Sequence, residues 1–153
     1  LVILTRELHG MVQQHKLEDW LGQIHKVLKP NGVLSIEQHR DKTDSNPEET
    51  AKNGYLPEKW VIAKIEAAGF KLAGKSEINA NAKDTKDYAD GVWTLPPTYR
   101  DGDKDRAKYA AIGESDRMTL KFVKVAKKAA APAKAAAPAK AAAPAKTAAP
   151  AKK

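Results

Sequence analysis

The segment VLKPNGVLSIEQHR, residues 27–40, decides the fold of this 153-residue chain. It closes a stretch in which apolar side chains recur at three- and four-residue steps, a spacing typical of an amphipathic helix: Leu17, Trp20, Leu21, Ile24, Val27 and Leu28. Residues 29–32 (KPNG) end that helix, because proline cannot continue it and Asn-Gly favours a turn. Residues 33–36 are apolar again, so the segment predicts a helix, a turn and a strand.

A second strand is predicted at the start of the chain. Leu1–Leu4 are continuously apolar, which indicates a strand buried on both of its faces. A strand, a helix and a strand form a βαβ unit, and such units have parallel strands and a right-handed crossover. The abrupt apolar start, with no initiator Met, predicts that the sequence is a piece of a longer protein.

Further elements are predicted as far as residue 125. Residues 38–54 are polar and predict a long loop. A second helix begins near Pro57 and ends at Gly69, with an apolar face at Val61, Ile62, Ile65 and Ala68. Strands are predicted from Phe70 to about residue 78 and over Met118–Val125, where apolar and polar side chains alternate. We expect an α/β fold in which this closing pair forms an antiparallel edge on an otherwise parallel sheet.

The charge of the chain is unevenly distributed. Of its 27 Lys and Arg residues, seven lie in residues 126–153, which contain no acid, whereas residues 1–125 hold the other 20 and all 19 acids. The sequence therefore predicts one nearly neutral domain, residues 1–125, and a basic tail. The absence of cysteine excludes a disulfide scaffold and a thiolate metal site, and no apolar run approaches the roughly 20 residues of a membrane helix.

The tail consists of repeats. Residues 129–146 are three copies of AAAPAK, and residues 147–152 are a fourth copy with Thr in first place. Proline every six residues prevents a continuous helix, and alanine buries too little surface to offset the entropy of ordering. We therefore predict that residues 126–153 form a disordered, extended arm.

Candidate site residues follow the first two predicted strands. In open α/β sheets, ligands bind outside the carboxyl ends of the parallel strands. Those ends are followed by residues 5–9 and 37–41, and each group contains a histidine, His9 or His39, beside arginines and acids. Such a cluster is suited to acid–base chemistry, whereas the alternative interpretation is ordinary solvation of loop residues. The four histidines are not spaced as a metal-binding tract, so no metal site is predicted.

An aromatic and proline-rich segment lies in the polar stretch of residues 79–117. Residues 93–99, WTLPPTY, indicate either a lid packed on the edge of the sheet or a cap over a substrate pocket. A packed lid would serve both roles, so Trp93 is a candidate substrate-binding residue.

The order of these phrases resembles the C-terminal half of class I S-adenosylmethionine-dependent methyltransferases. The resemblance rests on residues 27–40, on "IEAAGFKL" at residues 65–72, and on their order along residues 1–125. With "SDRMTLKF" at residues 115–122, the chain also resembles a bacterial group of predicted methyltransferases. The resemblance implies a Rossmann-like sheet of which only the C-terminal half is present.

The resemblance also implies a cofactor and residue roles. S-adenosylmethionine is expected to meet Thr5, Arg6 and Glu7 through its methionine end. His9 and His39 are expected to face the acceptor, as bases or as orienting groups, and Arg40 and Trp93 to bind it. The glycine-rich turn that holds most of the cofactor in this family has no counterpart here, so residues 1–153 alone are not expected to bind it measurably.

Two functions remain open from the sequence. The first is methyl transfer to an unidentified small-molecule acceptor, and its cofactor favours a cytoplasmic location. The second is a nucleic-acid-associated protein whose tail lysines neutralise phosphates without reading sequence. A solubilising extension is the alternative interpretation of the tail.

Overall fold

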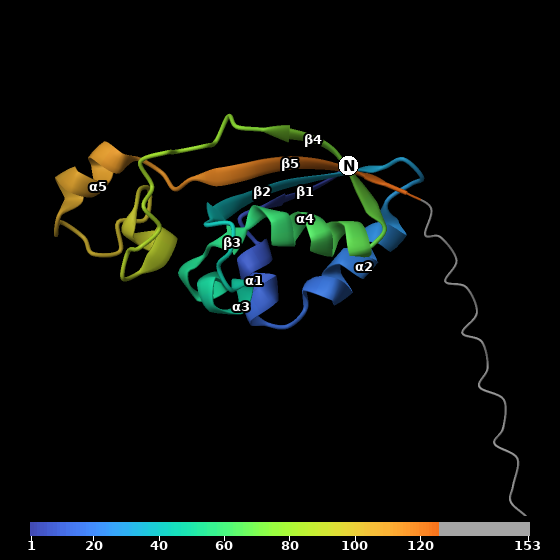
Figure 1. Ribbon diagram of the computed structural model, residues 1–153, viewed down its shortest axis with the longest axis horizontal. Helices are drawn as coiled ribbons and strands as arrows, with labels where there is room; N and C mark the ends of the chain where they lie inside the picture. Colours follow the sequence, from blue (N-terminus) through green and yellow to red (C-terminus); the bar gives the residue numbers. More distant parts are fainter. Residues whose placement is uncertain (126–153) are drawn as a thin grey trace, which may run out of the picture.

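The computed structural model describes residues 1–125 (Figure 1). The predicted disordered arm, residues 126–153, lies outside the described residues. Five strands form a mixed sheet: β1 (Val2–Thr5), β2 (Val33–Asp41), β3 (Leu56–Pro57), β4 (Phe70–Ser76) and β5 (Arg117–Lys124). The helices are α1 (Leu8–Gln13), α2 (Leu17–Val27), α3 (Pro47–Thr50), α4 (Glu58–Ala67) and α5 (Arg106–Ile112), with 3₁₀ turns η1 (Ala51–Asn53) and η2 (Gly91–Thr94).

The sheet confirms the predicted α/β class and its mixed strand directions. β1 and β2 are parallel, with Val2 opposite Leu34, and the short β3 extends the parallel pairing at the far end of β2. β5 lies between β2 and β4 and is antiparallel to both, so the strand order is β1-β2-β5-β4. A β-bulge at Leu72–Gly74 shifts the register of β4, which a glycine without a side chain allows.

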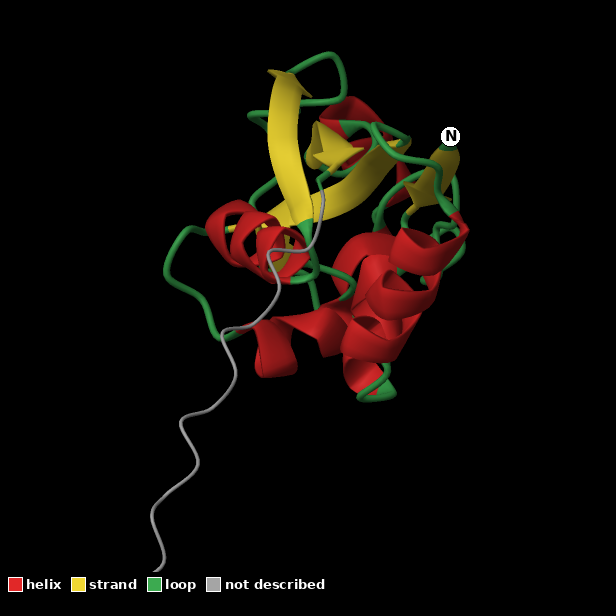
Figure 2. Cartoon of the chain, turned by 90° about the vertical axis from the view of Figure 1, so that its right-hand side faces the viewer, coloured by secondary structure: helices red, strands yellow, loops and turns green. Residues whose placement is uncertain are grey.

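The core lies between the sheet and helices α1–α4, which cover one face of it (Figures 1 and 2). Leu34 and Ile36 of β2 and Leu120 and Phe122 of β5 are at most 1% exposed. Their side chains alternate with more exposed residues, as a strand covered on one face requires. Burying each of these side chains contributes about 2 kcal/mol.

Both predicted helices are confirmed. The helix predicted over residues 17–28 is α2, and the helix predicted to start near Pro57 is α4. Gly69 follows α4 with φ of 96°, a left-handed conformation that glycine adopts without strain. A Cβ there would also lie 2.9 Å from Nε2 of His25.

The strand at the start of the chain is not buried on both faces, which corrects the prediction. In β1 and beside it, Ile3 is 61% exposed and Leu1 is 77% exposed, because the helices cover only one face of the sheet. Trp20 and Val27, placed on the apolar face of α2 by their spacing, are 51% and 73% exposed. The face of α2 that packs against the core is narrower than the apolar spacing predicts. Spacing alone does not separate the residues at the centre of an apolar face from those at its edges.

The long loop predicted over residues 38–54 is wrong for most of its length. Residues 38–41 continue β2, and residues 47–53 form α3 and η1. Pro47 occupies the first turn of α3, and the side chain of Asn46 accepts a hydrogen bond of 3.1 Å from the N–H of Glu48. Helix α1 was not predicted, because two buried apolar residues, Leu8 and Val12, give too short a pattern to stand out.

Residues 77–116 lie beyond the carboxyl ends of β1 and β2, at the left of Figure 1. They connect β4 to β5 and contain η2 and α5. Among residues 1–125, no helix is both long and apolar enough to cross a membrane.

Candidate functional site

The carboxyl ends of β1 and β2 lie side by side. Thr5, the last residue of β1, pairs with Glu37 in the parallel register, and the N–H of Arg6 donates a 2.7 Å hydrogen bond to the carbonyl of Glu37. Arg6 has φ of 59°, and this sharp turn leads directly into α1, which carries His9. β2 continues beyond this point, so His39 is presented by the strand itself.

A cavity of about 310 Å³ lies at this end of the sheet. Its walls bring together five of the candidate residues: Arg6, Glu7, His9, His39 and Trp93. A more open hollow of about 370 Å³ beside it shares residues 114, 115 and 117 but contains no histidine. The cavity with both histidines is therefore the candidate functional site.

His9 contacts residues of β2 and of η2. Its Nδ1 lies 3.3 Å from Nε2 of Gln38, and its ring meets the ring of Trp93 edge-on at 5.8 Å between centroids. The ring of His39 lies 5.9 Å away. Burial lowers the pKa of His9 despite the hydrogen bond to Gln38 and the nearby charge of Glu7, so the ring is neutral at pH 7.

His39 is buried and contacts the segment before β5. Its Nδ1 lies 2.5 Å from the hydroxyl oxygen of Ser115. Burial above all, together with the neighbouring His9 and the positive charges of Arg117 and Arg6, lowers the pKa of His39 to about 3. His39 is therefore a neutral group at physiological pH, able to donate or accept a hydrogen bond.

Arg117 adds a guanidinium to the cavity wall. Its Nη1 donates a hydrogen bond of 2.5 Å to Glu114, and its Nε lies 2.6 Å from a carboxylate oxygen of Glu37, although that N–H is not aligned for a hydrogen bond. Two carboxylates therefore fix Arg117. Arg6, which is exposed, forms no ion pair with any residue of the described chain.

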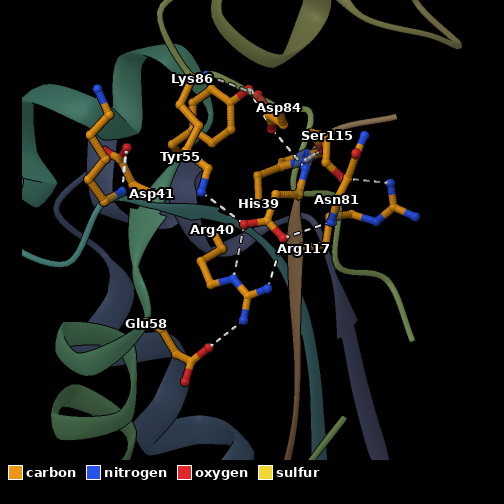
Figure 3. A network of polar contacts seen from close by, with 12 residues as sticks. His39, Arg40, Asp41, Tyr55, Glu58, Asn81, Asp84, Lys86, Ser115 and Arg117 are labelled. Atoms are coloured by element: carbon orange, nitrogen blue, oxygen red, sulfur yellow. Dashed lines mark hydrogen bonds and ion pairs between the residues drawn. The ribbon is translucent and has the colours of Figure 1, made fainter. Parts of the chain in front are cut away.

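Arg40 lies outside the cavity lining, in the network drawn in Figure 3. Side chains alternate along β2, so Arg40 points away from the side of His39. Its guanidinium donates hydrogen bonds to three carboxylates: Asp116, Glu58 and Glu77. These contacts raise the pKa of Arg40, above all through Asp116.

Asp84 connects residues 77–116 to Tyr55, which directly precedes β3. Its carboxylate accepts a hydrogen bond of 3.0 Å from the hydroxyl of Tyr55 and one of 2.8 Å from the N–H of Asp116 (Figure 3). Lys86 reaches Asp116 at 2.8 Å. The network thus holds in place the segment that brings Ser115 and Arg117 to the cavity.

The aromatic segment is a packed lid that also lines the cavity. Leu95 is fully buried and Val92 is 6% exposed, whereas Trp93 lines the cavity and lies under the guanidinium of Arg100 at 4.8 Å. The lid approaches η1 closely at Gly91, where a Cβ would lie 2.2 Å from the carbonyl oxygen of Asn53. The packed lid is therefore confirmed and the segment also lines the cavity, whereas its role as a cap over a substrate pocket stays a prediction.

The structure thus gathers five of the seven candidate residues and leaves out Thr5 and Arg40. Sequence reasoning missed Ser115 and Arg117 as site residues, although both belong to the "SDRMTLKF" phrase, and it gave Gln38 no role. Their contribution depends on the antiparallel pairing of β5 with β2, which sets Arg117 opposite His39. No local pattern contains that pairing.

The chemistry available in the cavity is that of hydrogen bonding and of charges of both signs. Its wall contains two neutral imidazoles, a serine hydroxyl, the guanidinium groups of Arg6 and Arg117 and the carboxylates of Glu7 and Glu114. Within residues 1–125, no group of three His, Asp or Glu side chains is arranged to hold a metal ion.

Comparison with known proteins finds no family model, no curated protein and no solved structure that matches this chain.

Proposed function

We propose that this chain carries the acceptor-binding part of an S-adenosylmethionine-dependent methyltransferase acting on a small molecule. One observation supports the proposal most: His9 and His39 reach a single cavity from the carboxyl ends of two adjacent parallel strands. The α/β sheet with its antiparallel closing strands is the arrangement that the sequence resemblance implies.

The residues after β1 fit one end of the cofactor. Arg6 and Glu7 are adjacent, oppositely charged and exposed in the cavity wall, which suits the carboxylate and ammonium of a bound amino acid. Thr5 is exposed at the end of β1. Within the described residues, no glycine-rich turn lies at the cavity to receive the adenosine. When bound, the cofactor supplies an electrophilic methyl group on sulfur.

The residues of the chain would position the acceptor for this transfer. His9, His39 and Trp93 form a wall of rings around the cavity, so a flat acceptor can pack there with its reacting atom held by hydrogen bonds. Arg40 acts indirectly, because its contacts with Asp116 fix the segment that carries Ser115.

The coding sequence upstream of Leu1 tests this proposal. We expect a strand, a glycine-rich turn and a helix in that order, followed by an acidic residue after the next strand. Protein from the whole reading frame should then transfer tritiated methyl groups from S-adenosylmethionine to acceptors in a metabolite extract. His39→Gln should lower that transfer. An upstream sequence without the glycine-rich turn would refute the proposal.

The nucleic-acid alternative depends on residues 126–153, which lie outside the described residues. Residues 1–125 are nearly neutral, and the cavity lined by His9 and His39 suits a small molecule. A filter-binding titration with duplex DNA, with and without residues 126–153, measures any contribution of the tail.

A further inference from the structure

Gln38 connects the sheet to His9. It is a completely buried residue of β2, and its side-chain Nε2 lies 2.8 Å from the carbonyl oxygen of Gly54 and 3.3 Å from Nδ1 of His9. An amide nitrogen carries two hydrogens and no lone pair, so it donates to both neighbours.

The orientation of this amide is fixed by Gly54. If the amide were turned over, its oxygen would face the carbonyl oxygen of Gly54, and two acceptors would repel each other at hydrogen-bond distance. The observed orientation makes that contact favourable, and it leaves Oε1 of Gln38 without a partner among the described residues. The Gly54 contact therefore determines that a donor faces His9.

A donor facing Nδ1 determines the tautomer of His9. Nδ1 must carry a lone pair to accept from Gln38, so a neutral ring carries its proton on Nε2. Burial lowers the pKa of His9, which favours the neutral ring. Nε2 forms no hydrogen bond with another described residue, and the ring lines the cavity.

We propose that Gln38 locks neutral His9 as the Nε2–H tautomer, so that His9 donates a hydrogen bond to a carboxylate or carbonyl oxygen of the ligand in this cavity. Only the identification of that ligand as the methyl acceptor rests on the proposed function. In this tautomer Nε2 has no lone pair, so His9 positions the ligand and does not take its proton.

Nitrogen-15 NMR of the histidine rings tests the tautomer in the full chain. Long-range correlations from the ring carbon-bound protons distinguish a protonated ring nitrogen from an unprotonated one, and His9→Gln identifies the signals of His9. At pH 7.5 we expect a protonated Nε2 and an unprotonated Nδ1. A protonated Nδ1, or an even mixture of the two tautomers, would overturn the proposal.

Substitution of Gln38 tests the cause. Gln38→Glu places an acceptor beside Nδ1 and should move the proton from Nε2 to Nδ1. Gln38→Leu removes the donor and should give a mixture of tautomers. His25→Gln is the matched control, because His25 lies outside the cavity and contacts the carbonyl of Val125, and it should leave His9 unchanged. If a Gln38 variant does not fold, the unsubstituted protein still decides the tautomer.

Two small probes test the ligand class. Benzoate combines a flat ring with a carboxylate, and benzylamine has the same ring with a group that only donates. We expect benzoate to shift the Nε2–H signal of His9, with at least a tenfold weaker response in Gln38→Glu, and benzylamine to have no effect. Equal effects of the two probes, or no effect of benzoate, would exclude this ligand class. The probes need no methyl donor, so failure of the methyltransferase proposal would leave these results unchanged.

Discussion

Arg40 and Asp116 join β2 to the segment before β5 through two hydrogen bonds, from Nε to Oδ2 at 3.1 Å and from Nη2 to Oδ1 at 2.8 Å. The two side chains are 18% and 9% exposed. Asp116 stands between Ser115 and Arg117, and Arg40 follows His39, so this pair joins two segments that line the cavity.

Removing the guanidinium should destabilise the protein strongly. Arg40→Met leaves the buried Asp116 with Lys86 as its remaining cation, removes the partner of Glu77 and leaves Glu58 with Lys75 alone. We expect the free energy of unfolding, measured with urea at pH 7, to fall by about 3 kcal/mol, as for other broken buried pairs.

An exposed ion pair provides the control. Lys64 contacts Glu18 at 2.6 Å, and both side chains are well exposed, at 38% and 65%. Lys64→Met should therefore cost less than about 1 kcal/mol. If the two substitutions cost the same, the Arg40–Asp116 pair does not have the structural role described.

The acid limit of stability should depend on Asp116. Burial alone would raise the pKa of Asp116, but hydrogen bonds from Arg40, Lys86 and the N–H of Asn81 outweigh it and lower the pKa from 3.8 to about 2. The unfolded chain therefore takes up this proton at higher pH than the folded one. The stabilisation is complete above about pH 4 and is lost as the pH falls towards 2, to a total of about 2 kcal/mol.

Urea unfolding from pH 5 to pH 2 measures this effect. Asp116→Asn should start less stable and lose less free energy of unfolding over that interval than the unsubstituted protein. Asp103→Asn, at an exposed position, should retain the original pH dependence. An unchanged acid limb in Asp116→Asn would contradict the assignment.

The sequence was sufficient to predict those helices and strands in which the spacing of apolar residues repeats several times. α2 and α4 have several apolar residues at helical spacing and clear stop signals, and apolar and polar residues alternate in β5 from Arg117 to Phe122. α1 has too few turns to show a period, and the continuation of β2 through residues 38–41 is polar because it serves the site. Tertiary contacts, rather than local preference, hold these residues in a strand.

The site was predictable only to the extent that it follows strand ends. His9 and His39 could be found because parallel strands place their carboxyl ends at one edge of the sheet. Arg40 lies at the same strand end, but its side chain points away from the side of His39 because side chains alternate along a strand. There it pairs with three carboxylates that do not line the cavity. Ser115 and Arg117 are about 76 residues further along the chain, so only the pairing of β5 with β2 reveals them.

His39 should make stability pH-dependent in a different interval. Burial and nearby cations lower the pKa of His39 from 6.5 to about 3, so between these values the unfolded chain binds a proton that the folded chain does not. The stabilisation is therefore complete above about pH 6.5 and is lost as the pH falls. His39→Gln should reduce the slope of unfolding free energy against pH, between pH 6 and 4, by up to about 1.4 kcal/mol per pH unit.

NMR provides the second measurement for His39. Its ring carbon-bound protons should not titrate between pH 8 and 5. A titration of His39 near pH 6.5 would contradict the neutral state that the cavity chemistry requires.

The lid should be sensitive to one added methyl group. Gly91 has φ of 55°, and a Cβ there would lie 2.2 Å from the carbonyl oxygen of Asn53, so Gly91→Ala forces η2 away from η1. Because η2 carries Val92 and Trp93 into the cavity wall, this displacement should both cost about 2 kcal/mol of unfolding free energy and enlarge or open the cavity.

Gly10→Ala is the matched control, since a Cβ at this position in α1 meets nothing within 4 Å and alanine favours a helix. Urea unfolding should show a loss for Gly91→Ala and a gain of up to about 1 kcal/mol for Gly10→Ala. The ring centroids of Trp93 and His9 lie 5.8 Å apart. Nuclear Overhauser effects between the protons of these two rings should weaken only in Gly91→Ala. If those effects persist unchanged, the close approach of η1 and η2 does not position the lid.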